Sequence, residues 1–292
     1  AGPVCAEEEE GDGGKGMGVG DRGQGAGDRG QGTVKRETAR VLRWVGLLEA
    51  GRRAELRWRM GQARALPDAV ILGAQKSGTS SLHNYLVQHP GVVEPLRKEV
   101  HYFDVAYERG EAWYRAHFGP LGAPGLNLDS SPYYLFHPAV PQRLHDLLPD
   151  AKLIVLLRDP VRRAYSHYWH ERDKRRETLG FEDAIAAEPE RLGDSHLQLA
   201  AGTLQRSHAH QHFSYLARGR YAEQLERWFT LFPREQFLVL RFEDLAREPL
   251  GALNQTLDFL GLPQATTVSL EARNTRQYPP LAVATAALLR AE

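Results

Sequence analysis

Short apolar runs and amphipathic stretches alternate along the chain from residue 67 onward. Four runs are apolar enough to be buried strands, at residues 69–73, 126–129, 152–157 and 237–241. Between and after them, apolar residues recur at helical spacing in residues 79–88, 140–148, 162–175 and 250–260. Nearly continuous apolar strands that alternate with helices are typical of parallel sheets covered on both faces. The pattern therefore predicts one three-layer α/β domain over residues 67–292.

The first 32 residues have a different composition. They hold 12 of the chain's 28 glycines and no aromatic residue, and the unit Gly20-Asp-Arg-Gly-Gln-Gly is repeated from Gly27. Such a segment has too little apolar surface to offset its conformational entropy, so we expect a disordered tail over residues 1–32. A basic RNA-binding tail fits less well, because aspartates balance the arginines and four glutamates stand at residues 7–10.

Residues 33–66 are rich in basic side chains, with nine Lys or Arg against three Glu. Leu42, Val45, Leu48 and Leu56 recur at helical spacing, which predicts a basic amphipathic helical segment. Such a helix either packs on the domain that follows or lies on an anionic membrane surface. We favour packing on the domain.

Composition excludes several classes of protein. The 37 basic and 37 acidic side chains leave no net charge, which disfavours a protein that coats nucleic acid. The longest aliphatic run covers residues 153–157 and is far shorter than the roughly 18 residues of a membrane span. The single cysteine, Cys5, excludes an internal disulfide and a cysteine-rich zinc site. We therefore expect a cytoplasmic protein without a transmembrane helix.

The first predicted strand runs into Gly73-Ala-Gln-Lys-Ser-Gly-Thr-Ser-Ser81 and then directly into a helix. Glycines allow a tight turn, and the helix N-terminus offers backbone N–H groups to an anion. The side chains and glycine that would line this P-loop-like cradle are Lys76, Ser77, Gly78, Thr79, Ser80 and Ser81. The nucleoside triphosphate P-loop differs, because its lysine follows the second glycine. By itself the segment also fits a turn made of small residues.

A second candidate is Arg158-Asp-Pro…Ser166, which follows the strongest predicted strand. Open α/β sheets bind ligands at the carboxyl ends of their strands, so Arg158 and Ser166 could together hold one phosphate. Equally, Arg158 could pair with Asp159 while Ser166 bonds its own helix backbone.

A third candidate is Arg97-Lys-Glu-Val-His-Tyr-Phe-Asp104. Glu99 and His101 alternate, so an extended segment would project both to one side, with Asp104 near enough to support them. A carboxylate beside an imidazole and a lysine suits a general base. An ordinary surface cluster of charges would have the same composition.

The three segments together resemble the sulfotransferases that use 3′-phosphoadenosine-5′-phosphosulfate (PAPS). The 74–79 segment is similar to their 5′-phosphosulfate loop, and Arg158-Asp-Pro…Ser166 to their 3′-phosphate motif. Lys98-Glu-Val-His-Tyr-Phe-Asp104 resembles a segment of the heparan sulfate 3-O- and N-sulfotransferase branch. Gly219-Arg-Tyr221, Trp228, Phe232-Pro233 and Asp258-Phe-Leu-Gly-Leu262 fit the same branch, so the resemblance covers about residues 68–262.

The resemblance implies roles for these residues. Lys76 would stabilise charge on the bridging oxygen as the sulfuryl group leaves, and the 77–81 backbone and hydroxyls would hold the same phosphosulfate. Arg158 and Ser166 would hold the 3′-phosphate. Glu99 would be the base that deprotonates a hydroxyl or amine acceptor, assisted by His101 and Asp104. His101 is the alternative base, as in the small-molecule enzymes. The family needs no metal for this chemistry.

Some features depart from that branch. Asp129-Ser-Ser-Pro-Tyr133 lacks the lysine that heparan sulfate enzymes often carry there, so the implied acceptor is a carbohydrate or another metabolite in general. The cysteine pair of the secreted branch is missing, and the family usually continues beyond the segment at residues 274–278. We therefore expect a soluble, bacterial-type relative whose C-terminus is shortened.

Two other classes of function stay open from the residues themselves. A P-loop-type nucleotide kinase is disfavoured by the position of Lys76, and a non-catalytic nucleotide-binding protein would keep the cradle without the chemistry. The alternating His208, His210 and His212 could form a metal tract, but no carboxylates stand at a matching spacing.

Overall fold

The computed structural model describes residues 45–61, 63–269 and 278–291. Contacts divide the chain into two units, Ala1–Leu47 and Leu48–Glu292, and the architecture below is that of the second. The expected tail at residues 1–32 and the first part of the basic segment lie outside the described residues. Residues 45–59 are helical, as the spacing of apolar residues predicts. The division of the chain into domains stays a prediction.

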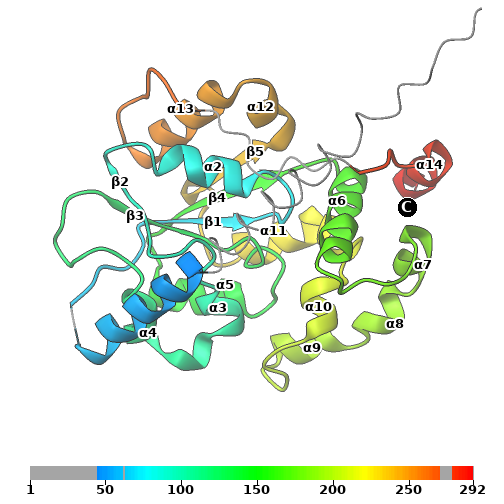
Figure 1. Cartoon of the computed structure of the whole chain (residues 1–292), viewed down its shortest axis with the longest axis horizontal. Helices are drawn as coiled ribbons and strands as arrows, with labels where there is room; N and C mark the ends of the chain where they lie inside the picture. The colour runs from blue at the N-terminus through cyan, green and yellow to red at the C-terminus, as the bar shows by residue number, and fades with distance from the viewer. Residues whose placement is uncertain (1–44, 62, 270–277, 292) are drawn as a thin grey trace, which may run out of the picture. The chain divides into compact units, whose positions relative to one another are not determined.

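Five parallel strands form the centre of the fold (Figure 1). Their order in the sheet is β2-β3-β1-β4-β5, and every neighbouring pair is parallel. The strands are β1 (Ala69–Gly73), β2 (Val92–Val93), β3 (Leu126–Ser130), β4 (Lys152–Leu157) and β5 (Phe237–Arg241). The predicted parallel sheet is therefore confirmed.

Alternate residues of the central strands enter two separate apolar cores, one on each face of the sheet. Val70 and Leu72 of β1 belong to one core, which includes Phe103, Leu144 and Trp228. Their neighbours on β1 point to the opposite core. That core contains Ala69, Ile71, Leu82, Leu86, Leu253 and Leu257. Because side chains alternate along a strand, a strand that is apolar throughout must be covered on both faces.

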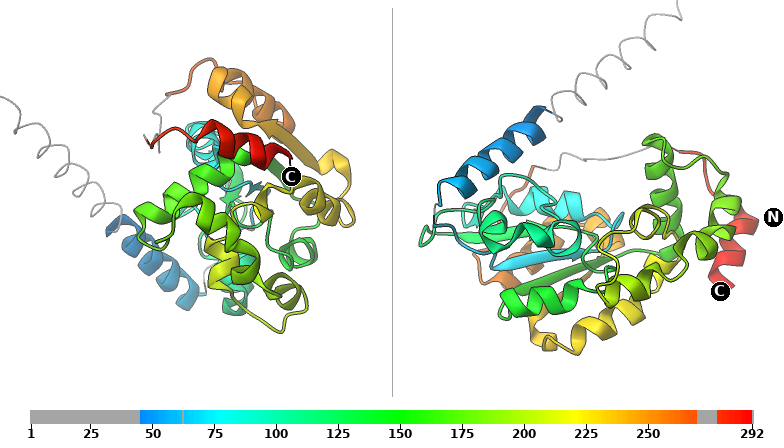
Figure 2. Two further views of the ribbon diagram at one scale, coloured as in Figure 1. Left: turned by 90° about the vertical axis from the view of Figure 1, so that its right-hand side faces the viewer. Right: turned by 90° about the horizontal axis from the view of Figure 1, so that it is seen from below.

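The helices form a layer on each face and a third group at one end of the sheet. Figure 1 shows α2, α12 and α13 on one face and α3, α5 and α11 on the other. In the third group α14 contacts α6, and a further apolar cluster joins α6 to α7 (Figure 2). The helices are α2 (Thr79–Leu86), α3 (Tyr102–Val105), α4 (Glu111–Arg115), α5 (Val140–Leu147), α6 (Pro160–Asp173), α7 (Phe181–Ala186), α8 (Glu188–Leu192), α9 (Ser195–Ala200), α10 (His208–His212), α11 (Tyr221–Phe229), α12 (Phe242–Arg247), α13 (Pro249–Leu260) and α14 (Val283–Ala291), with 3-10 turns η1 (Tyr107–Arg109), η2 (Ala217–Gly219) and η3 (Arg234–Gln236).

The four predicted strands and the four predicted helices all exist, with ends that differ by a few residues. The sequence pattern missed β2, because two residues are too few to show a period. It also missed the short helices between Phe181 and His212, which are five or six residues long and too short to show a long apolar stripe. Within the described residues, no helix combines the length and apolar character needed to cross a membrane.

Gly73 ends β1 at the point where that strand's register with β4 shifts. Its φ is 151°, and a Cβ there would lie 2.8 Å from the Pro132 carbonyl oxygen and 3.0 Å from Leu135 Cβ. The segment that follows β3 therefore packs directly on the end of β1. Only glycine permits that close approach.

We expect Gly73→Ala to lower the free energy of unfolding by about 1–3 kcal/mol, because the added methyl group meets backbone that cannot move away. Urea denaturation measures the change. Gly51→Ala is the matched control, since nothing lies within 4 Å of its Cβ position and the residue is helical. This control should stabilise the protein by about 0.5–1 kcal/mol. Equal midpoints for Gly73→Ala and the wild type would contradict the close packing.

Candidate functional site

The segment from Gly73 to Ser81, here called the anion loop, connects β1 to α2 as predicted. Gly78 has a φ of 88° at the N-cap of α2, and a Cβ there would lie 2.8 Å from the Phe242 ring. Ser77 and Thr79 are buried. Backbone N–H groups in the first turn of a helix have no acceptor within that helix, so the start of α2 suits an anion.

Arg158 joins the anion loop to the end of β4. Its Nη1 donates to the Lys76 carbonyl oxygen at 3.0 Å, and its guanidinium lies 4.5 Å from the centroid of the Phe242 ring. The carbonyl of Arg158 accepts from the Tyr221 hydroxyl at 3.0 Å. Arg158 Nε is buried and has no hydrogen-bond partner within the described part of the chain. The first two predicted segments thus form one site that leaves a buried donor open.

The alternative in which Asp159 pairs with Arg158 differs from the structure, where Asp159 contacts other residues. Asp159 instead caps α6, accepting from the Arg162 N–H at 2.8 Å, and lies 3.7 Å from Arg290. Ser166 is buried on the second turn of α6.

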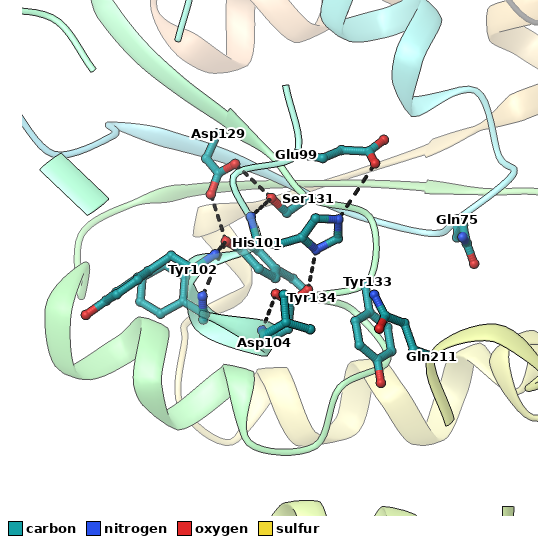
Figure 3. Close-up of polar contacts among 12 residues, drawn as sticks. Gln75, Glu99, His101, Tyr102, Asp104, Asp129, Ser131, Tyr133, Tyr134 and Gln211 are labelled. Carbon is teal, nitrogen blue, oxygen red and sulfur yellow. Dashed lines mark hydrogen bonds and ion pairs between the residues drawn. The ribbon is translucent and has the colours of Figure 1, made fainter. Parts of the chain in front are cut away.

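The third predicted segment brings Glu99, His101 and Asp104 together (Figure 3). His101 lies between the two carboxylates, with Nδ1 2.6 Å from Asp104 Oδ2 and Nε2 3.7 Å from Glu99 Oε2. Lys98 Nζ donates to Glu99 Oε1 at 2.6 Å. Asp104 is fully buried, whereas 42% of the Glu99 side chain is exposed. We call these four residues the Glu99 cluster.

The charges of the Glu99 cluster set its protonation. Burial opposes protonation of His101, but Asp104 and then Glu99 outweigh it and raise the His101 pKa to about 10. Burial also opposes ionisation of Glu99, but Lys98 and His101 hold its pKa well below the ordinary range. At neutral pH the site therefore holds an imidazolium and an ionised glutamate.

The expected extended backbone at Glu99 and His101 is wrong. Both residues have positive φ, 63° and 58°, so the strand-like alternation does not bring their side chains together. The described residues include four non-glycine positions with positive φ, and three of them are Lys76, Glu99 and His101. Such strained positions concentrate at functional sites, and the surrounding structure must hold them in place.

Backbone contacts to the segment after β3 hold this strained turn. The Glu99 N–H donates to the Ser130 carbonyl oxygen at 3.1 Å, and the His101 N–H donates to Ser131 Oγ at 3.1 Å. The Tyr102 N–H donates to the Tyr134 hydroxyl at 2.8 Å.

Asp129, fully buried at the end of β3, anchors these contacts (Figure 3). Its Oδ2 accepts from the hydroxyls of Tyr114 at 2.9 Å and Tyr134 at 3.0 Å, and its Oδ1 accepts from Ser131 at 3.0 Å. Burial raises the pKa of Asp129, although the three hydroxyl donors oppose that change. The carboxylate thus fixes the hydroxyls that receive the backbone of the Glu99 cluster.

A chain of contacts links the anion loop to the same segment. Gln75 Oε1 accepts from Arg218 Nη1, and the Arg218 guanidinium lies 4.6 Å from the centroid of the Tyr133 ring. On α2, His83 Nδ1 lies 2.9 Å from Ser130 Oγ. The anion loop and the Glu99 cluster therefore share the carboxyl ends of β1, β3 and β4.

Sequence reasoning missed the contacts that Arg218 and Asp129 make at the site. Asp129 carried a usable signal, since it stands at the end of a predicted strand beside a Ser-Ser-Pro turn. Arg218 directly precedes the Gly219-Arg-Tyr221 motif.

The histidines considered as a metal tract lie on α10 and face different surroundings. His210 is buried, with Nδ1 2.6 Å from the Tyr133 hydroxyl, whereas His212 Nδ1 lies 3.4 Å from Glu171 Oε2. Over the part of the chain that the structure describes, no group of three or more His, Cys, Asp or Glu side chains could hold a metal ion.

Comparisons with known proteins give a consistent result. Human heparan sulfate glucosamine 3-O-sulfotransferase 6 is 35% identical over 204 residues, which are 70% of this chain and 55% of that protein. The membrane-associated sulfotransferase kil1 of Dictyostelium discoideum is 28% identical, over 76% of this chain and 61% of its own length. This chain thus spans little more than half the length of these curated relatives.

A solved sulfotransferase from Alicyclobacillus acidocaldarius aligns with a TM-score of 0.60 and 34% identity, covering 72% of this chain and 86% of that one. The family model described as sulfotransferase domain matches residues 66–280. That match contains the anion loop, Arg158, Ser166 and the Glu99 cluster. The protein therefore belongs to the sulfotransferase domain family.

Proposed function

We propose that this protein transfers a sulfuryl group from PAPS to a hydroxyl or amine of a carbohydrate or another metabolite. The observation that carries the proposal is the contact between Arg158 Nη1 and the Lys76 carbonyl, at 3.0 Å. This contact joins the two segments that we expect to bind anions, and the ionised Glu99 lies at the same edge of the sheet. Membership of the family supports the same chemistry.

The residues at this edge suit a donor with several negative charges. The buried Arg158 Nε has no partner among the described residues, which is the arrangement expected of a donor group that awaits an anion. The start of α2 and Lys76 would hold the phosphosulfate end, while Arg158 and Ser166 would hold the 3′-phosphate. PAPS supplies an activated sulfuryl group whose leaving oxygen belongs to a phosphate.

Each site residue would then have a separate role in sulfuryl transfer. Glu99 would accept the proton of the acceptor hydroxyl as the acceptor oxygen bonds to sulfur and the sulfur–oxygen bond to the phosphate breaks. Lys76 would stabilise the negative charge that develops on the leaving phosphate oxygen. His101 is already protonated and cannot accept another proton, so its role would be to keep Glu99 ionised and oriented. Asp104 would hold His101 in that state.

Binding and transfer assays test the proposal. In titration calorimetry the desulfated product, 3′-phosphoadenosine 5′-phosphate (PAP), should bind without magnesium and ATP should bind poorly. Radiolabelled PAPS should label at least one member of a panel of sugars, lipids and phenols. Magnesium-dependent ATP binding without any response to PAP would favour a nucleotide kinase instead. PAP binding without transfer to any acceptor would favour a non-catalytic nucleotide-binding protein. The cytoplasmic location stays a prediction.

Lys76 and Arg158 should affect different kinetic constants. Lys76→Ala should lower kcat about 10²–10³-fold, because its charge acts on an oxygen that becomes more negative in the transition state. Arg158→Ala should mainly raise KM for PAPS and weaken PAP binding about 10–100-fold, because the 3′-phosphate changes little during transfer. The specific readout is the preference for PAP over adenosine 5′-phosphate. An Arg158→Ala variant that keeps this preference would show that Arg158 does not bind the 3′-phosphate.

Glu99→Gln should lower kcat about 10²–10⁴-fold while PAP affinity stays near that of the wild type, because the amide keeps the shape but accepts no proton. His101→Ala is the comparison. If Glu99 is the base, the histidine variant should be the less damaged of the two. If Glu99→Gln keeps more than about a tenth of the wild-type kcat, the assignment of the base is wrong.

The acid limb of the pH–rate profile should lie at unusually low pH. Lowering the pKa of Glu99 keeps its basic form populated as the pH falls, so kcat should be retained through pH 4.5, the ordinary glutamate value. Removing the nearby imidazolium in His101→Ala should move the acid limb to higher pH. Circular dichroism at each pH checks that the protein stays folded. A wild-type acid limb near pH 10, where the His101 imidazolium loses its proton, would identify His101 as the base instead.

A further inference from the structure

Arg163 is buried completely on α6, between Arg158 and Ser166 in the chain. Its Nη2 donates to the Tyr215 carbonyl oxygen, but Nε and Nη1 have no hydrogen-bond partner within the described residues. Buried guanidinium groups are normally paired with a carboxylate, because an unpaired buried charge is strongly unfavourable. The burial of the Arg163 charge without a carboxylate partner therefore needs a physical explanation.

A second buried arginine, Arg218, has only neutral partners as well. Nη1 donates to the side chain of Gln75 in the anion loop, and Nε donates to Ser214 Oγ at 2.7 Å. Nη2 donates to the carbonyl oxygens of His210 at 3.0 Å and Gln211 at 2.6 Å. The rings of Tyr133 and Phe136 complete its surroundings.

The carboxylates whose charge acts on these arginines are bound elsewhere. Glu188 accepts from the backbone N–H groups of Leu216 at 2.7 Å and Ala217 at 2.8 Å. Glu171 lies 3.0 Å from Arg176. Burial accordingly lowers the pKa of both Arg163 and Arg218, in the second case to about 10. Among the described residues, neither arginine has a carboxylate as a hydrogen-bond partner.

The two arginines lie on elements that contact each other and the anion loop. The helix α6 carries Arg163 and packs on η2, which carries Arg218, and Arg218 Nη1 donates to Gln75 in the anion loop. The charge of Arg158 lowers the pKa of Arg163, and Lys76, Arg163 and Arg218 all lower the pKa of His167, after the larger effect of burial. The Tyr221 hydroxyl, which donates to the Arg158 carbonyl, also responds to the charge of Arg163. Arg163 thus adds buried positive charge on the helix that follows Arg158.

We propose that Arg163, together with Arg218, is a buried cation pair whose missing counter-charge is the phosphate groups of the nucleotide donor. This inference rests on the proposed function. The pair would favour binding of a nucleotide phosphorylated at both the 3′ and 5′ positions of its ribose over a singly phosphorylated one. This preference would come from electrostatic attraction through the protein rather than from direct contact. Without a bound nucleotide, the buried charge of Arg163 would not stabilise the fold.

Arg163→Met tests the pair, because methionine fills a similar volume without charge. At an effective dielectric constant of about 20, one unit charge acting over roughly 10 Å changes affinity about tenfold per ligand charge. PAP affinity should therefore fall at least tenfold, adenosine affinity should not change, and the ligand-free melting temperature should stay equal or rise. Arg163→Lys, which keeps the charge, should retain PAP affinity within about threefold. Arg162→Met on the exposed side of α6 is the matched control and should resemble the wild type.

The opposite pattern would overturn the proposal. If Arg163→Met melts at a lower temperature and keeps the wild-type ratio of PAP to adenosine affinity, Arg163 is a structural residue only. If Arg163→Met does not fold, Arg163→Lys decides by the same ratio. Pyrophosphate separates this inference from the proposed function. The wild type could fail to bind PAP but show a higher melting temperature with pyrophosphate, an increase that Arg163→Met lacks. That result would refute PAPS as the donor and support the cation pair.

Discussion

The buried carboxylate of Asp129 is the interaction on which the arrangement of the site depends. It orients two tyrosine hydroxyls and the Ser131 hydroxyl, and two of these three receive backbone N–H groups of the turn that carries the Glu99 cluster. That turn has positive φ at both Glu99 and His101, a conformation that needs external support. The same segment packs its Pro132 carbonyl on Gly73 at the end of β1. One buried acid therefore sets the position of the candidate base relative to the anion loop.

The balance of charge in the site suits transfer of an anionic group. Glu99 stays ionised because Lys98 and the His101 imidazolium lie on either side of it. A glutamate with a lowered pKa is a weaker base than an unperturbed one, but it is always in the form that accepts a proton. On the opposite side, the anion loop contains Lys76 and accepts hydrogen bonds from Arg158 and Arg218. In the proposed function, this positive charge would hold the anionic donor and the ionised Glu99 would act on the acceptor.

The sequence by itself predicted four of the five strands and placed the three candidate segments. Ala69–Gly73 and Lys152–Leu157 are apolar throughout, and this alone requires cover on both faces of a parallel sheet, as the two cores show. Gly73, Lys76 and Gly78 stand at the end of the first strand, so the anion loop could be placed before any contact was known. Arg158 could be placed for the same reason. These features are local, because they follow from the period of side chains and from residues adjacent to a strand end.

Only the tertiary structure decided how the site is held and charged. Glu99 and His101 meet through a left-handed turn, which no alternation of residues indicates, because the contacts that stabilise it come from residues 130–134. Arg163 and Arg218 are buried although charged residues on helices are normally exposed, and Arg218 reaches Gln75 across 143 residues of sequence. The protonation of His101 likewise depends on its distances to Asp104 and Glu99. Burial and electrostatic pairing are properties of residues brought together by the fold, so they cannot be read from neighbours in the chain.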